Sequence, residues 1–228
     1  MNPTILNPIT GAPIDLSHPI ESGMTTYPGL PAPLVGEHLS RAASGVLYAP
    51  GTTFSIGRIE MVANTGTYLD APFHRFAEGD DIAALSLPRV AAVAGVVVDA
   101  RGKGPALGPE VFADVALEDR AVLVWTGWDA HWRTPEYGAG NHPFLTRDAA
   151  ERLVSGSPSL VGIDSLNIDD VRDLARPAHT LLLKAGIPIV EHLTNLESVR
   201  PGAFRFFAVP APVRGMGSFP VRAFVLPG

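Results

Sequence analysis

The sequence contains no cysteine among its 228 residues. This absence excludes disulfide bonds and thiolate metal ligands, and it favours a cytoplasmic location. Basic residues are also scarce, since 17 Lys and Arg stand against 23 Asp and Glu, which gives a formal net charge of −6. No cluster of Lys and Arg forms a basic stripe, so the composition argues against a nucleic-acid partner.

Long hydrophobic runs are missing as well. The longest apolar stretch, residues 90–98, is interrupted by Gly95 and closed by Asp99, and it is far shorter than the roughly 20 residues of a membrane-spanning helix. Residues 1–14 contain no basic region and no apolar core, so we expect no signal peptide. The sequence therefore indicates no membrane partner. The chain also shows no internal repeat and no glycine-rich phosphate or dinucleotide motif.

What is present is a hydrophobic chain with many turn residues. Hydrophobic residues make up 46%, and 22 Pro and 23 Gly accompany them, which is typical of a compact globular enzyme with sharp connections. No charge-rich or low-complexity stretch divides the chain. We therefore expect a single domain over residues 1–228.

Short runs rich in Val, Ile and Phe predict strands. They cover residues 52–62, 95–100, 121–126, 159–163, 187–191, 204–209 and 220–226. Helices are fewer. The clearest covers residues 146–155, with Thr146 as its cap and Gly156 at its end, and residues 109–116 and 168–174 predict shorter ones. The mixture indicates an α/β protein built around a mixed sheet.

Residues 64–74 carry the densest group of reactive side chains. They read Asn-Thr-Gly-Thr-Tyr-Leu-Asp-Ala-Pro-Phe-His. In an extended strand alternate side chains share a face, which would place Asn64, Tyr68 and Asp70 together. Asp70 and His74 are then able to serve a metal ion or a reacting group. The alternative is a strand end at which both residues only satisfy backbone donors.

A second group of polar residues lies downstream, where His179, Glu191 and His192 flank an apolar run. Burying Glu191 in this context would be costly unless its carboxylate is paired or coordinated. The open alternatives are that Glu191 faces solvent while His192 packs, or that His179 caps a helix end. Asp164, which follows a predicted strand, is expected to cap the next turn rather than serve a site.

The segment 64–74 resembles the signature of the cyclase family of metal-dependent hydrolases, which includes bacterial kynurenine formamidases. That signature reads His-x-Gly-Thr-His-x-Asp-x-Pro-x-His, and its first two histidines are Asn64 and Tyr68 in this chain. Downstream, His179 and Glu191 keep the family's spacing, and residues 186–196 are similar to the family's continuation Gly-Ile-Pro-Ile-x-Glu-x-Leu-x-Asn-Leu. The resemblance extends over most of the chain.

The resemblance implies a swivelling β/β/α fold, which agrees with the α/β interpretation. It also implies that Asp70, His179 and Glu191 retain the protein ligands of one of the family's two metal ions, here zinc or manganese. The other ion would lose two ligands. His74 stands at the position of the family's proton-shuttling histidine, and an imidazole suits that role.

Three further residues are expected to bind substrate. Tyr27 precedes Pro-Gly in a segment that resembles the family's opening, where an aromatic residue contacts the substrate. Asn64 and Tyr68 are poor metal ligands, but both donate hydrogen bonds that would hold a substrate carbonyl or an oxyanion.

Together these features predict a hydrolase that acts on carbon–nitrogen bonds other than peptide bonds. A single metal ion would activate water for attack on an amide, formamide or lactone in a small, cyclic or aromatic substrate, while His74 moves the proton. Two alternatives remain. One is a kynurenine formamidase proper, which the replaced ligands argue against, and the other is a non-catalytic relative that binds a small molecule. The family resemblance also implies a homodimer or homotetramer.

Overall fold

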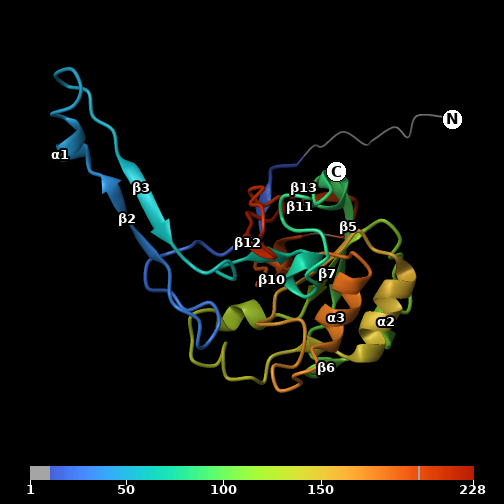
Figure 1. Cartoon of the computed structure of the whole chain (residues 1–228). Helices are drawn as coiled ribbons and strands as arrows, with labels where there is room; N and C mark the ends of the chain where they lie inside the picture. Colours follow the sequence, from blue (N-terminus) through green and yellow to red (C-terminus); the bar gives the residue numbers. More distant parts are fainter. Residues whose placement is uncertain (1–10, 200) are drawn as a thin grey trace, which may run out of the picture.

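A computed structural model describes residues 11–199 and 201–228 of the chain (Figure 1). Its largest element is a nine-stranded mixed sheet, and this confirms the α/β prediction. The strands lie side by side in the order β1 (Ile14–Asp15), β13 (Phe224–Pro227), β11 (Phe204–Phe207), β5 (Val93–Asp99), β7 (Ala121–Trp125), β9 (Leu160–Ile163), β10 (Ile189–Glu191), β4 (Tyr68–Asp70) and β12 (Ser218–Pro220). Residues 1–10, part of the segment in which no signal peptide is expected, lie outside the described residues.

The centre of this sheet is parallel. Strands β5, β7, β9 and β10 run in one direction. Antiparallel strands continue the sheet on both sides, with β11, β13 and β1 next to β5 and with β4 and β12 next to β10. Because the carboxyl ends of parallel strands meet at one edge, ligand sites of α/β proteins commonly lie there.

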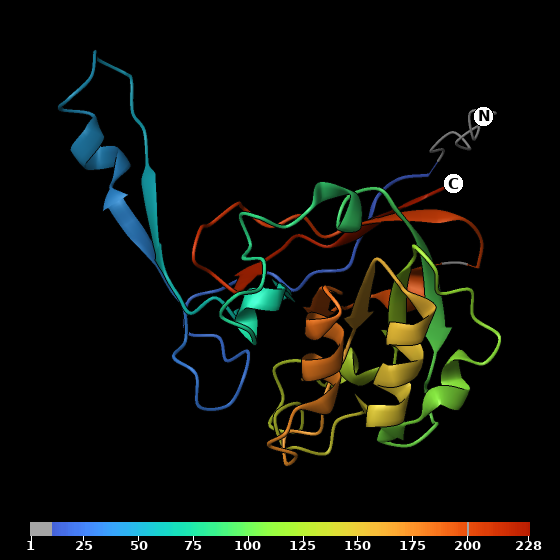
Figure 2. The same cartoon turned by 45° about the vertical axis from the view of Figure 1, so that its right-hand side comes forward.

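Alternate residues of the central strands face opposite layers. Val122 of β7 packs beneath the two longest helices, α2 (Arg147–Gly156) and α3 (Pro177–Lys184), which lie side by side over one face of the sheet (Figure 2). The next residue, Leu123, faces the other layer together with Phe206. Both faces are therefore buried, which explains why these strands are continuous apolar runs in the sequence.

The remaining elements are short. A pair of strands forms an arm that projects from the body of the protein (Figures 1 and 2). The arm comprises β2 (Leu34–Leu39), α1 (Arg41–Ser44) and β3 (Ile56–Glu60), and the other short elements are β6 (Ala106–Leu107), β8 (Phe144–Leu145) and the 3-10 helices η1 (Pro72–His74), η2 (Leu87–Arg89), η3 (Pro109–Phe112), η4 (Trp128–His131) and η5 (Leu196–Ser198). Within the described residues, none of the helices has the length and apolar character that crossing a membrane requires.

Most of the expected elements are present. The strands predicted at 95–100, 121–126, 159–163, 187–191 and 204–209 correspond to β5, β7, β9, β10 and β11. The helix predicted at 146–155 is α2, and the Thr146 side chain caps it by accepting a hydrogen bond from the Ala149 backbone amide at 3.2 Å. Only part of 52–62 is strand, in β3, and the run 220–226 is divided between β12 and β13.

Two helix predictions need correction. Residues 109–116 form only the 3-10 helix η3. Residues 168–174 form turns rather than a helix, because short acidic side chains bond to the backbone there, as Asp170 does to the amide of Arg172 at 3.0 Å. The helix of this region is α3, which begins at Pro177.

The Thr146 cap offers a test of helix α2. Replacing Thr146 with Ala removes the acceptor of the Ala149 amide and should lower the free energy of unfolding by about 1 kcal/mol. Thr146→Ser, which keeps the hydroxyl, should cost much less. Urea denaturation followed by circular dichroism measures both, and equal losses in the two variants would show that the cap contributes nothing.

Candidate active site

Strand β4 organises one half of the candidate site. It lies between β10 and β12, so that Asp70 is opposite Ile189 on one side and Ser218 on the other, and Tyr68 is opposite Glu191. Directly opposed residues of antiparallel strands point to the same face. Tyr68, Asp70, Glu191 and Ser218 therefore share a face at the end of the sheet where β10 terminates.

The extended segment is shorter than the sequence suggested. Only Tyr68–Asp70 is strand, and residues 64–67 form bends in which Gly66 has a φ of +66°, a left-handed conformation that favours glycine. Asn64 reaches the site from this loop. Its amide lies 3.5 Å from Asp70 Oδ1 and 3.3 Å from Ser218 Oγ.

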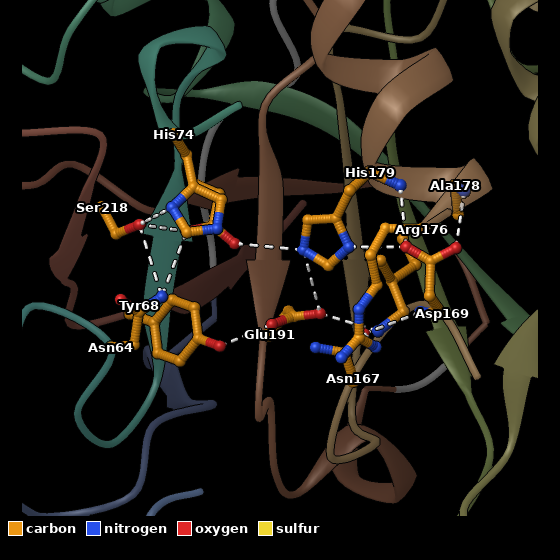
Figure 3. A network of polar contacts seen from close by, with 12 residues as sticks. Asn64, Tyr68, His74, Asn167, Asp169, Arg176, Ala178, His179, Glu191 and Ser218 are labelled. Atoms are coloured by element: carbon orange, nitrogen blue, oxygen red, sulfur yellow. Dashed lines mark hydrogen bonds and ion pairs between the residues drawn. The ribbon is translucent and has the colours of Figure 1, made fainter. Parts of the chain in front are cut away.

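Helix α3 supplies the other half of the site through His179. Asp169 is fully buried and accepts hydrogen bonds from the Ala178 and His179 backbone amides at 2.6 and 3.0 Å. It therefore satisfies two of the free amides in the first turn of the helix. The same carboxylate accepts a bond from His179 Nδ1 at 2.7 Å. With Nδ1 held in this way, Nε2 is the ring nitrogen that faces the site (Figure 3).

Two carboxylate oxygens lie in front of this nitrogen. His179 Nε2 lies 3.5 Å from Asp70 Oδ2 and 3.6 Å from Glu191 Oε1, and Asp70 Oδ2 is buried without a hydrogen-bond partner in the described part of the chain. Ligands bound at 2.0–2.2 Å in tetrahedral geometry are about 3.3–3.6 Å apart. Both distances from His179 Nε2 lie in this range, whereas the donor atoms that all lie within 4.8 Å of one another belong to Asp70, His74 and His179.

The charges of the site also favour a cation. Asp70 and Glu191 are completely buried, and burial raises the pKa of Glu191 to about 7 although the nearby His179 opposes this shift. Burial disfavours the charged imidazole of His179, yet the carboxylates of Glu191, Asp169 and Asp70 outweigh it and raise its pKa to about 10. An excess of buried negative charge thus surrounds His179, and a bound metal ion would compensate it.

The Tyr68 hydroxyl forms a hydrogen bond with Glu191, one of the predicted metal ligands. Its hydroxyl donates to Glu191 Oε2 at 2.5 Å, while Glu191 Oε1 accepts from the Ile168 amide at 2.7 Å and faces His179. Burial, followed by the charges of Glu191 and Asp70, raises the pKa of Tyr68 well above its usual value. The phenol is therefore neutral and acts as a hydrogen-bond donor that orients Glu191.

His74, at the end of η1, is oriented by Ser218. The Ser218 hydroxyl lies in a very short contact with Asp70 Oδ1 and 2.9 Å from His74 Nδ1. Since a carboxylate only accepts, the single hydroxyl proton goes to Asp70, and His74 Nδ1–H must donate to Ser218 Oγ. In the neutral imidazole of His74, Nε2 is then the ring nitrogen that can accept a proton.

These groups surround one cavity of about 320 Å³. Six of the seven predicted site residues line it, namely Tyr27, Asn64, Tyr68, His74, His179 and Glu191, and the other lining residues are Leu30, Arg75, Asn167 and Arg176. Asp70 lies buried between His74 and His179, and one donor atom from each of these three residues fits within a 4.8 Å cluster. The structure thus brings all seven predicted residues together.

The sequence did not predict two residues that contact the site, Asp169 and Ser218. Asp169 lies in the stretch that was expected to be a helix. Ser218 lies far from both motifs in the sequence, and no pattern around it indicates a site residue. Asp164 behaves as expected, because its carboxylate accepts bonds from the Thr126 amide and hydroxyl and from the Gly127 amide at 2.6–2.8 Å. It therefore caps a turn and does not reach the site.

The contact between Asp169 and His179 makes a testable contribution to metal binding. Asp169→Asn removes the charge that orients the imidazole and increases its basicity, so the affinity for zinc or manganese should fall about 10–100-fold. The neighbouring Asp170→Asn is the matched control and should leave affinity unchanged, because within the described residues the Asp170 side chain pairs only with Arg172. Titration calorimetry with each metal measures both, and equal affinities would remove Asp169 from the site.

The amino-acid sequence is similar to that of known metal-dependent hydrolases and to one protein family. Residues 14–170 match the Cyclase family, described as "Putative cyclase". Kynurenine formamidase of Bacillus cereus is 28% identical over 94% of this chain and 97% of its own length, and that of Geobacillus thermodenitrificans is 29% identical over 92% and 95%.

Solved structures match over similar lengths. The predicted metal-dependent hydrolase of Bacillus stearothermophilus has a TM-score of 0.74 at 26% identity and covers 94% of this chain and 97% of that one. Isatin hydrolase A of Labrenzia aggregata shares the fold, with a TM-score of 0.79 at 21% identity over 94% and 93%. With a family match over more than half of its length, the chain belongs to the Cyclase family.

Proposed function

We propose that this chain is a metal-dependent hydrolase that cleaves an amide, formamide or lactone bond in a small aromatic substrate. The observation that carries the proposal is the convergence of Asp70 Oδ2, His179 Nε2 and Glu191 Oε1 at a cavity whose wall contains His74. The relatives named kynurenine formamidase support a reaction at a carbon–nitrogen bond. The cavity size suits a small molecule.

The residues that would hold the ion are Asp70, His179 and Glu191. Two carboxylates and one imidazole suit zinc or manganese, and we propose one ion of this kind per chain. When bound, such an ion supplies Lewis acidity, which polarises a carbonyl and makes water more acidic.

His74 is the proposed proton carrier. Ser218 holds its Nδ1–H, so Nε2 is free to accept a proton from the attacking water and to return it to the leaving nitrogen or oxygen. The side chain is 37% exposed, which allows exchange with solvent after each turnover.

Substrate binding is assigned to four other residues of the cavity wall. Tyr27 and Leu30 line the cavity and provide apolar surface for an aromatic ring. Asn64 and Tyr68 lie beside the carboxylates of the proposed metal centre, where their N–H and O–H groups would position the scissile carbonyl.

Kynurenine formamidase itself is a second candidate. The names of the similar relatives favour it, whereas Asn64 and Tyr68 stand where the family signature has two histidines. A formamidase that depends on both metal ions would have lost one of them, so we place this chain among single-ion hydrolases.

The metal content tests the proposal directly. Protein purified without chelators and dialysed against zinc or manganese should hold about one ion per chain, since three ligands suit one ion with open positions. Elemental analysis measures this number. A value near zero after reconstitution with both metals would overturn the metal-dependent function and leave a small-molecule binding protein.

Variants of His74 and Glu191 separate proton transfer from metal binding. His74→Ala should lower turnover of a hydrolysed probe by roughly 10²-fold without changing metal content, whereas Glu191→Gln should lower metal content as well. N-formylkynurenine and dihydrocoumarin serve as formamide and lactone probes. Loss of the ion from His74→Ala would instead make His74 a ligand.

The two replaced histidines can be restored. In the double variant Asn64→His with Tyr68→His, the content should rise from one ion to two, because Asp70 lies next to position 64 and Glu191 next to position 68. Activity on a native substrate should fall, since the groups that hold its carbonyl are gone. Elemental analysis of the folded double variant decides, and an unchanged ion content would show that these positions do not form a metal site.

A further inference from the structure

Two arginines line the active-site cavity, and neither takes part in the proposed hydrolysis. Arg176 stands at the start of helix α3, and Arg75 follows η1. Their hydrogen bonds go to neutral acceptors, since Arg75 Nε donates to Thr180 Oγ1 at 3.4 Å and Arg176 donates to an amide oxygen and a carbonyl. Within the described residues, neither guanidinium is paired with a carboxylate, although the chain as a whole has a net charge of −6.

Arg176 uses only one of its terminal nitrogens for these bonds. Nη1 donates to Asn167 Oδ1 at 3.4 Å (Figure 3) and to the Asp170 carbonyl at 3.3 Å. The Asp170 carboxylate is engaged by Arg172 and does not neutralise Arg176. In the described part of the chain, Nε and Nη2 have no acceptor. The N–H groups of this edge of a guanidinium are able to bind a carboxylate through two parallel hydrogen bonds.

The backbone of Arg176 has a conformation that arginine rarely adopts. Its φ is +48° and its ψ is +60°, which is the left-handed region that glycine and asparagine enter most readily. Other residues in this conformation cluster at ligand sites, where the surrounding structure holds them in place. An arginine at this position therefore indicates a role for its side chain at the cavity.

Asn167 supplies a second donor beside Arg176. It is buried, yet it lines the cavity. Its Oδ1 accepts from the Asp169 amide at 3.0 Å as well as from Arg176, and because a backbone amide only donates, this contact fixes the orientation of the side chain. Nδ2 is then the end that donates, and it has no acceptor among residues 11–199 and 201–228. A ligand oxygen in the cavity would provide one.

The other charges of the cavity favour an anionic ligand. Glu191 is the one carboxylate among the described residues that line it, and it faces the proposed metal ion together with Asp70. With this ion in place, the charges left uncompensated are the two arginines. They attract an anionic group and repel an ammonium group. The volume of about 320 Å³ is small for a ligand pocket and suits one aromatic ring with short substituents.

We propose that Arg176 and Asn167 bind a carboxylate of the substrate. The substrate is then an aromatic amide, formamide or lactone that carries a carboxylate and no ammonium group. Arg176 precedes the proposed ligand His179 by three residues in the first turn of α3, so the carboxylate is bound close to the scissile bond, on the ring itself or next to it. This inference rests on the proposed hydrolysis and adds the residue that selects the substrate.

A matched pair of formamides tests the preference for charge. N-formylanthranilate and formanilide differ only in a ring carboxylate. The zinc-loaded or manganese-loaded protein should have a kcat/KM at least about 10-fold higher for N-formylanthranilate, which is the effect of one charge-assisted bidentate contact. N-formylkynurenine, which has an ammonium group as well as a carboxylate, should be a poorer substrate than N-formylanthranilate. Equal kcat/KM values for the matched pair would overturn the proposal.

Variants of Arg176 locate the preference in this side chain. Arg176→Gln should lower kcat/KM for N-formylanthranilate at least about 10-fold and change the value for formanilide far less. Arg176→Lys keeps the charge without the planar fork and should retain part of the preference. Arg172→Gln is the matched control, since Arg172 pairs with Asp170 outside the cavity lining. Equal losses for both formamides in Arg176→Gln would show that Arg176 only anchors the turn before α3.

Binding measurements separate this inference from the proposed reaction, because they require no turnover. In titration calorimetry, the zinc-loaded protein should bind anthranilate at least about 10-fold more tightly than aniline, and Arg176→Gln should remove most of this difference. Failure to hydrolyse either formamide would count against the proposed function, and the calorimetry would still decide the carboxylate site. An affinity for anthranilate that depends on zinc and is unchanged in Arg176→Gln would assign the carboxylate to the ion and overturn the proposal.

Discussion

The antiparallel pairing of β4 with both β10 and β12 is the constraint on which the site depends. It aligns Asp70 with Ser218 and Tyr68 with Glu191 across three strands. A shift of one residue would turn these side chains to the opposite face, where apolar residues such as Leu69 are packed. The hydrophobic core therefore holds the polar site in register.

Buried charge is the second organising feature. Asp70, Asp169 and Glu191 are all inaccessible to solvent and lie around His179, an arrangement that would be costly without compensation. Backbone amides, Tyr68 and Ser218 satisfy most of their oxygens. One oxygen, Asp70 Oδ2, has no hydrogen-bond partner among the described residues and lies 3.5 Å from His179 Nε2, where a bound cation would compensate its charge.

Much of the fold could be predicted from local patterns. The apolar runs of β5, β7 and β9 are visible because both faces of the sheet are buried, and α2 is visible because Thr146 caps an amphipathic stretch. Prediction failed where local signals conflicted. Residues 168–174 have the acidic start of a helix, yet their carboxylates bond to nearby amides and to α3 instead.

The sequence by itself determined the composition of the site, since the segment 64–74, His179 and Glu191 bring the reactive groups in a recognisable order. Only the tertiary structure decided how these groups act. Asp169 and Ser218 gain their roles through helix packing and strand pairing, which join segments distant in the sequence. No local pattern records such contacts, because they arise from the register of β4 between β10 and β12 and from the docking of α3.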